Sequence, residues 1–137
     1  MKVSKTLIYI LLSELFFTIL PILIIIIVRS YMKEFSKIFF NSEWAICAII
    51  LFGQSIVKFS SGIANSEKKF KWQIISFLNT LIIIIGLIPS IIVLVIIILT
   101  DSTSLTLHIF QIFLFILSCI SFFIVGAAGQ ELLERKK

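Results

Sequence analysis

Four polar side chains that could do chemistry lie inside long apolar stretches of this sequence. Glu14 interrupts the first stretch at LLSELFF, Gln54 and Lys58 occur one helical turn apart in the second, and Asn79 occurs in the third. In apolar surroundings, a carboxylate and an ammonium group can carry a proton, bind an ion or neutralise each other. Which chemistry applies depends on the elements that hold these side chains.

The composition indicates that those surroundings are lipid. The chain has 137 residues, of which 60% are hydrophobic and 14% are charged, and its mean hydropathy is +1.20. Soluble domains are about 45–50% apolar and about 25% charged. Because a chain this short cannot bury so much apolar surface in one aqueous core, we expect an integral membrane protein.

Four apolar stretches are long enough to cross a hydrocarbon core of about 30 Å, which takes about 20 helical residues. Hydrocarbon offers no partner to backbone polar groups, so the stretches must be helical. The sequence therefore predicts an all-α fold, an integral membrane bundle of four transmembrane helices that forms a single domain. The expected spans are 5–28, 44–64, 72–100 and 105–130 of residues 1–137.

Two of these spans are unusual. The first follows MKVSK as a signal peptide would, but its length, Glu14 and Pro21, and the lack of a small-residue cleavage site, favour a retained span. The third would be about 43 Å long at 1.5 Å per residue. It must therefore tilt, bend near Pro89 or project from the membrane.

The basic residues predict the orientation. Eight of them flank the spans on one side of the expected topology and three flank them on the other. Positive charge favours the cytoplasmic side, so we expect both termini in the cytoplasm and the chain in a bacterial inner membrane. The segments SEKKFKW and ELLERKK are candidates for docking a partner or lipid headgroups, through Lys68, Lys69, Lys71, Arg135, Lys136 and Lys137.

The segment between the first two spans is amphipathic. In residues 28–40, VRSYMKEFSKIFF, apolar side chains recur at helical spacing and the charged ones take other faces. This pattern predicts an amphipathic outer helix that lies on the interface. The alternative is that it extends the first span and packs on neighbouring helices.

Residue counting places two opposite charges at a similar depth. From the ends of their spans, Glu14 lies about 13 Å and Lys58 about 10 Å from the cytoplasmic edge. An unpaired charge near the membrane centre costs about 2.5–3.5 kcal/mol. We therefore predict a Glu14–Lys58 ion pair, supported by Gln54 and Asn79, within or between subunits. Lys58 could instead reach the headgroups or face water.

Other polar and small residues form stripes along the spans, which are typical of helix faces inside a bundle and favour self-association. They include Gly86 and Ser90 of the third span and Gly126 and Gly129 of the fourth. Gly86, Pro89 and Ser90 could form a hinge or a passive kink. On the outer side, His108 and Gln111 lie one turn apart. They could sense pH or line a pore, or they could be a satisfied interfacial pair.

The sequence lacks the residue sets of enzymes and cofactor sites. It shows no Ser/His/Asp or Cys/His arrangement, no glycine loop for phosphate and no cluster with metal-ligand spacing. We therefore expect no enzyme activity, no cofactor and no metal. The net charge of +5 sits in segments that orient membrane helices, so we expect no direct binding of nucleic acid.

Two resemblances suggest functions. Glu14 in the first of four spans resembles the carboxylate with which small multidrug resistance transporters exchange protons and cationic drugs. Lys58, the long first loop and the scarcity of glycine in the third span depart from that pattern. A small transporter or pore that uses Glu14 is therefore the alternative function.

The overall architecture resembles that of the KwaA family, the four-helix membrane subunits of Kiwa antiphage systems. The likeness consists of the short chain, four spans, cytoplasmic ends and basic cytoplasmic segments, an outline that holins and bacteriocin-immunity proteins share. It implies a homo-oligomer that senses infection at the inner membrane and works with a cytoplasmic nucleic-acid-binding partner. We therefore expect a non-enzymatic sensor or effector subunit for antiviral defence or membrane stress.

Overall fold

The computed structural model describes residues 5–67, 69, 71–101 and 104–134. Throughout these ranges the regular structure is helical and no strand occurs, which confirms the all-α prediction. In chain order the elements are α1 (Lys5–Tyr31), η1 (Phe35–Phe40), α2 (Glu43–Ala64), α3 (Trp72–Ile82), η2 (Ile83–Leu87), α4 (Ile88–Thr100), α5 (Leu105–Ser121), η3 (Phe122–Gly126) and α6 (Ala127–Glu134).

Four continuous helical stretches of the described chain are long and apolar enough to cross a membrane: Lys5–Tyr31, Glu43–Ala64, Trp72–Thr100 and Leu105–Glu134. The four predicted helical stretches are present, and the first and fourth helices end at Tyr31 and Glu134 where the predicted spans end at Val28 and Gln130. Large apolar side chains cover much of the outer surface, including Phe17, Ile27 and Leu99. This surface is that of a multi-pass membrane protein.

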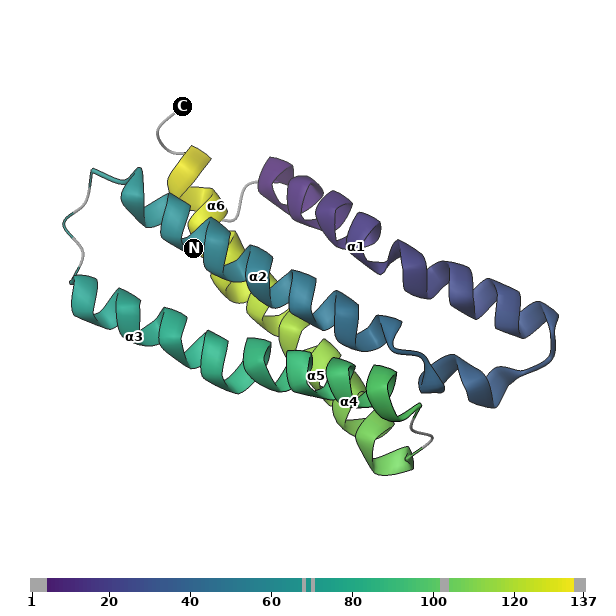
Figure 1. The fold of residues 1–137 in the computed structure, drawn as a ribbon. Helices are drawn as coiled ribbons and strands as arrows, with labels where there is room; N and C mark the ends of the chain where they lie inside the picture. The colour runs from purple at the N-terminus through teal and green to yellow at the C-terminus, as the bar shows by residue number, and fades with distance from the viewer. Residues whose placement is uncertain (1–4, 68, 70, 102–103, 135–137) are drawn as a thin grey trace.

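Helix α2 is the centre of the bundle. It lies between α1 and α3, with α5 and α6 running behind it (Figure 1), and it packs most extensively on α5, η3 and α6. Small or aromatic side chains of α2, such as Ala45, Ala48 and Phe52, form the core with Val93 and Leu114. One end of the bundle holds the start of α1, the end of α2, the start of α3 and the end of α6 (Figure 1). We call it the basic end, because Lys5, Lys69 and Lys71 belong to it.

Helix α1 is peripheral. Its buried residues, Leu7, Leu11, Thr18 and Ile22, fall on one stripe, and that stripe packs mainly on α2. The remaining faces carry exposed apolar side chains such as Phe16 and Phe17. The attachment of α1 to the bundle therefore depends on a single face.

The third span is irregular immediately before Pro89, at the place where a bend was one of the predicted alternatives. Residues Ile83–Leu87 form a π-helical turn. Proline has no N–H and its ring clashes with the carbonyl four residues earlier, here that of Ile85, so a regular α-helical turn is disfavoured. A Cβ atom at Gly86 would overlap the Phe52 ring, so this glycine allows the third span to pack closely on α2.

The fourth span contains a second π-helical turn, Phe122–Gly126, which the sequence did not predict. Beyond this turn the backbones of α2 and α6 touch. A Cβ atom at Gly62 would overlap the Gly129 backbone, and a Cβ atom at Gly129 would overlap the backbone of Lys58. Glycine is required on both helices at this crossing.

The segment after α1 differs from the single amphipathic helix predicted for residues 28–40. Its first part belongs to the last turn of α1, and the chain then turns at Lys33, which has φ 57°. Residues Phe35–Phe40 form a short 3₁₀ helix, of which Ile38 is buried. The Trp44 indole donates to the Ile38 carbonyl at 3.0 Å, which holds this segment against the start of α2.

Candidate functional site

The candidate site is an ion pair between two spans near the basic end of the bundle. Lys58 Nζ of α2 lies 2.8 Å from Oε2 of Glu14 on α1 and donates a hydrogen bond to Oε1 at 3.0 Å. Both residues belong to the same chain, so the pair forms within one subunit. The predicted Glu14–Lys58 pair is therefore present, and Lys58 does not extend to the headgroups.

A third residue completes the site. Lys58 Nζ also donates to Oε1 of Gln130 on α6 at 3.0 Å, so one ammonium group connects three helices. Sequence reasoning treated Gln130 only as the end of the fourth span. Its position four residues after Gly126 is the sequence signal nearest to this role, and that spacing alone does not give the direction of the side chain.

Glycines position the lysine. Because α2 and α6 approach closely at Gly62 and Gly129, the Lys58 stem lies against the end of η3, where Cδ is 3.6 Å from the position that a Cβ of Gly126 would take. On α1, the Thr18 hydroxyl donates to the Glu14 carbonyl at 2.9 Å. The thiol of Cys47 donates to the Thr18 carbonyl at 3.0 Å, which joins this turn of α1 to α2.

The two charged side chains differ in exposure. The Lys58 side chain is 13% exposed and the Glu14 side chain is 36% exposed. Glu14 therefore lies at the edge of the bundle, with one side against Lys58 and the other toward the surroundings of α1. A carboxylate at this depth gains most from a cation that neutralises it, and Lys58 supplies that charge.

Neither of the two predicted supporting amides hydrogen-bonds to the ion pair among the described residues. Asn79 Nδ2 donates to the Ser60 hydroxyl at 2.9 Å, so this amide joins α3 to α2. Within the described residues, Gln54 Oε1 and Asn79 Oδ1 are buried without a hydrogen-bond partner. The prediction that these two amides support the ion pair is wrong, because Gln130 takes that place.

The pair His108 and Gln111 is buried at the opposite end, where it holds the connector. Gln111 Nε2 lies 2.8 Å from the Asn41 carbonyl, 3.2 Å from the Phe39 carbonyl and 2.9 Å from His108 Nδ1. The imidazole packs edge-on against Phe40, with ring centroids 4.7 Å apart. These contacts fix η1 to α5, while Gln111 Oε1 is buried without a hydrogen-bond partner among the described residues.

Two of the six predicted docking residues belong to the part of the chain that the structure describes. Lys69 and Lys71 are exposed at the basic end, between α2 and α3. The other predicted docking residues, Lys68, Arg135, Lys136 and Lys137, lie outside the described residues. Among the described side chains, no group of three or more His, Cys, Asp or Glu could hold a metal ion.

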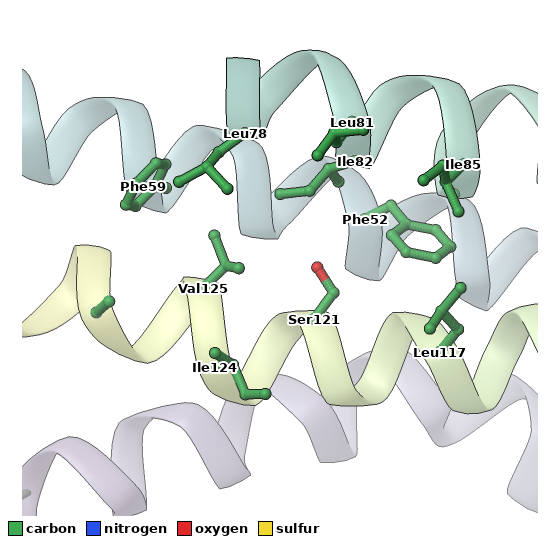
Figure 2. Close-up of a pocket in the computed structure, with 12 residues that line it drawn as sticks. Phe52, Phe59, Leu78, Leu81, Ile82, Ile85, Leu117, Ser121, Ile124 and Val125 are labelled. Carbon is green, nitrogen blue, oxygen red and sulfur yellow. The ribbon is translucent and has the colours of Figure 1, made fainter. Parts of the chain in front are cut away.

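A cavity of about 480 Å³ lies between α2, the third span and the fourth span. Figure 2 shows apolar side chains from all three, among them Phe59, Leu81 and Val125, around this space. No charged residue lines it, and neither Glu14 nor Lys58 contributes to its wall. The ion pair and the cavity are therefore separate features.

Comparison of the chain with protein-family models, with curated proteins and with solved structures finds no match.

Proposed function

We propose that this chain is a non-enzymatic, homo-oligomeric subunit of the bacterial inner membrane, which senses a membrane disturbance and signals to a cytoplasmic partner. The observation that carries the proposal is the Glu14–Lys58–Gln130 site, which ties the peripheral helix α1 to α2 and α6. In this reading the site is a latch between helices, and its opening is the signal.

The packing of α1 supports a latch. Besides one buried stripe and the hydrogen bond from Cys47 to the Thr18 carbonyl, α1 is held by the ion pair, so loss of the pair would weaken the attachment of this helix. Separating the two charges in lipid costs about 2.5–3.5 kcal/mol for each exposed charge. That cost is large enough to keep the latch closed at rest, and a disturbance of the membrane could overcome it.

The charge distribution supports a docking surface beside the latch. Lys69 and Lys71 are exposed in the connection between α2 and α3, and Lys58 and Gln130 belong to the halves of the second and fourth spans nearer to this basic end. With both termini in the cytoplasm, this end faces the cytoplasm, and a movement of α1 against α6 would reach a partner bound there. The likeness to the Kiwa membrane subunits supplies the setting, antiphage defence with a nucleic-acid-binding partner.

The alternative function is a small proton-coupled transporter or pore that uses Glu14. The 36% exposure of its side chain favours this alternative, because an exchanging carboxylate must be reachable. The lining of the 480 Å³ cavity counts against it, since the cavity contains no ionisable group. A cation held in this cavity would lie apart from the Glu14 carboxylate that should bind it.

The test of the proposal combines binding and flux. Protein partners are captured from the native host with the full chain, and proton flux is measured in liposomes that contain it. We expect Lys69→Glu with Lys71→Glu to abolish partner capture, whereas Lys33→Glu, an exposed lysine of the opposite end, leaves it unchanged. A subunit that conducts protons, and loses flux with Glu14→Gln, is a transporter and contradicts the proposal.

A further inference from the structure

We propose that the cavity between α2, the third span and the fourth span binds an apolar, lipid-dissolved small molecule that carries a carbonyl oxygen. The Ser121 hydroxyl donates the hydrogen bond that recognises this oxygen. The cavity belongs to a separate part of the bundle, and its occupancy does not depend on the Glu14–Lys58 ion pair.

The cavity exists because α3 is loosely held. All residues of α3 are described, and among them only Ile75 is buried; the close contact of the third span with α2 comes later, at Gly86 and Phe52. The space left beside α3 has a volume of about 480 Å³. Small-molecule sites in proteins measure about 300–1,000 Å³, so the cavity has the size of a ligand site.

The wall chemistry selects the kind of occupant. The wall is aliphatic and aromatic, with Phe52 and Phe59 from α2 and Leu117 from α5. An apolar cavity does not hold ordered water, which needs several polar partners, and an empty one forgoes dispersion contacts. We therefore expect an apolar molecule from the hydrocarbon region of the bilayer to occupy the cavity.

The Ser121 hydroxyl is the polar atom that makes the site specific. Within the described chain this oxygen is buried and has no hydrogen-bond partner, and Figure 2 shows it pointing from the fourth span into the cavity. Other hydroxyls of the spans donate to carbonyls of their own helix, as those of Ser55, Ser90 and Ser118 do. The Ser121 hydroxyl can therefore donate a hydrogen bond to a molecule bound in the cavity.

A lipid acyl chain does not satisfy this donor. A hydrocarbon tail would fill the space but leave the hydroxyl unpaired, and an unpaired buried polar group is costly. A molecule with a carbonyl oxygen near Ser121 meets both requirements, because it fills the apolar volume and accepts the hydrogen bond.

The cavity is accessible from the membrane side. Three of its lining residues, Leu78, Ile85 and Ile124, are also exposed on the outer surface of the bundle. They lie along α3, η2 and η3, so the opening faces the hydrocarbon region between the third and fourth spans. A ligand dissolved in the bilayer can therefore enter laterally.

Photolabelling of the full chain tests the inference. The chain is placed in vesicles of phosphatidylethanolamine and phosphatidylglycerol with either of two probes: an aliphatic ketone carrying a diazirine, or the alkane of the same length with the same diazirine. Labelled positions are mapped by mass spectrometry. We expect saturable labelling by the ketone at Leu81 and Val125, which unlabelled ketone competes away, and weaker, non-saturable labelling by the alkane.

Matched variants separate recognition from packing. Ser121→Ala should lower saturable ketone labelling about two- to tenfold, the range for loss of one hydrogen bond, and leave alkane labelling unchanged. Ser118→Ala, one turn earlier, removes a hydroxyl that already bonds the Phe115 carbonyl and should change neither. Val125→Phe should fill the space and reduce labelling by both probes.

Two results overturn the inference. If ketone and alkane label the cavity equally and Ser121→Ala has no effect, the cavity holds lipid tails without recognising a carbonyl. If neither probe labels the lining residues above the level found at the outward-facing Leu99, the cavity is not a binding site.

Discussion

The Lys58 ammonium group connects α1, α2 and α6 through Glu14 and Gln130. Charge reversal tests how much this contact stabilises the bundle. Lys58→Glu opposite Glu14 places two carboxylates together, and Glu14→Lys places two ammonium groups together. Removing one partner of a buried pair costs about 3–5 kcal/mol. Because Glu14 is 36% exposed, we expect each single reversal to lower the unfolding free energy by about 2–4 kcal/mol, measured by denaturant unfolding in detergent micelles.

The double reversal should restore most of that stability. Gln130 is a neutral amide with both a donor and an acceptor, so after a flip its Nε2 can donate to a glutamate at position 58. The site therefore accommodates either polarity of the pair. If the double variant is no more stable than the single ones, the contact between Glu14 and Lys58 does not hold α1.

Two amides of the spans have opposite expected effects. Gln130 accepts a hydrogen bond from a charged group, a kind of bond worth about 1.5–3 kcal/mol, so Gln130→Ala should destabilise the bundle by about that amount. Gln54 buries a carbonyl oxygen without a partner, so Gln54→Leu should be neutral or stabilising. The same unfolding assay compares them; equal losses in the two variants would contradict the assigned roles.

At this scale the sequence predicted the pair but not its third member. Counting residues along two regular helices gave Glu14 and Lys58 similar depths, and opposite charges in lipid have a strong reason to meet. Gln130 follows the π-helical turn Phe122–Gly126, which takes more residues per turn than an α-helix and changes the face that follows. A continuous helical repeat could not predict which way Gln130 points.

The crossing of α2 and α6 depends on glycine, and two glycines of α2 provide a matched test. A Cβ atom at Gly62 overlaps the α6 backbone, whereas nothing lies within 4 Å of one at Gly53. We expect Gly62→Ala to force the helices apart and lower stability by about 1–3 kcal/mol. Gly53→Ala should be neutral or gain about 0.5–1 kcal/mol from helix propensity.

These two variants also connect the crossing to the ion pair. Separation of α2 from α6 moves Gln130 away from Lys58, so Gln130→Ala should cost less in a Gly62→Ala background than in the parent chain. A double-mutant cycle in the unfolding assay measures this difference. Strict additivity would show that the crossing does not position the site.

The connector η1 should respond to acid through Glu34. Hydrogen bonds from Lys37 and Arg29 lower the pKa of this carboxyl below its usual 4.5. A lowered folded pKa contributes stability above the unfolded value, and the contribution is lost as pH falls through the folded value. We therefore expect η1 to loosen below pH 4.5 and to stay unchanged at neutral pH.

Tryptophan fluorescence reports this loosening. Trp44 donates to the η1 carbonyl of Ile38, so in a Trp72→Phe background its emission should shift as η1 detaches in acid. Glu34→Gln should remove this pH dependence, because the glutamine does not titrate. An acid transition that persists in Glu34→Gln would belong to another group.

For the helices, the sequence predicted where each one ends better than where its α-helical geometry is interrupted. The ends of the spans follow from where apolar residues stop, and these came within four residues of the structure. The helical spacing over residues 28–40 was misleading because the chain turns at Lys33, where φ is positive, and a lysine gives no sign of such a turn. Pro89 marked the first π-helical turn, whereas no proline marks the second.

In the molecule as a whole, three spans share one core and α1 packs beside it, an arrangement in which α1 can move separately, as the proposed function requires. The second, third and fourth spans share the core around Phe52 and Leu114, while α1 lies to one side and attaches through a stripe and a salt bridge. The ion pair that holds α1 and the exposed lysines therefore lie toward the same end of the bundle. A movement of α1 after the ion pair opens would therefore occur toward the end of the bundle that holds Lys69 and Lys71, the proposed docking residues.

Signalling to a cytoplasmic partner requires that the basic end face the cytoplasm, and cysteine labelling tests that orientation. In a background with Cys47→Ala and Cys119→Ala, single cysteines replace the exposed residues Ser36 of η1 and Lys69 of the basic end. The excess of basic residues predicts that a membrane-impermeant maleimide labels Ser36→Cys in intact spheroplasts and Lys69→Cys only after lysis. The reverse pattern would place the docking lysines outside, out of reach of a cytoplasmic partner, and the proposed signalling role would fail while the ion pair and the cavity would stand.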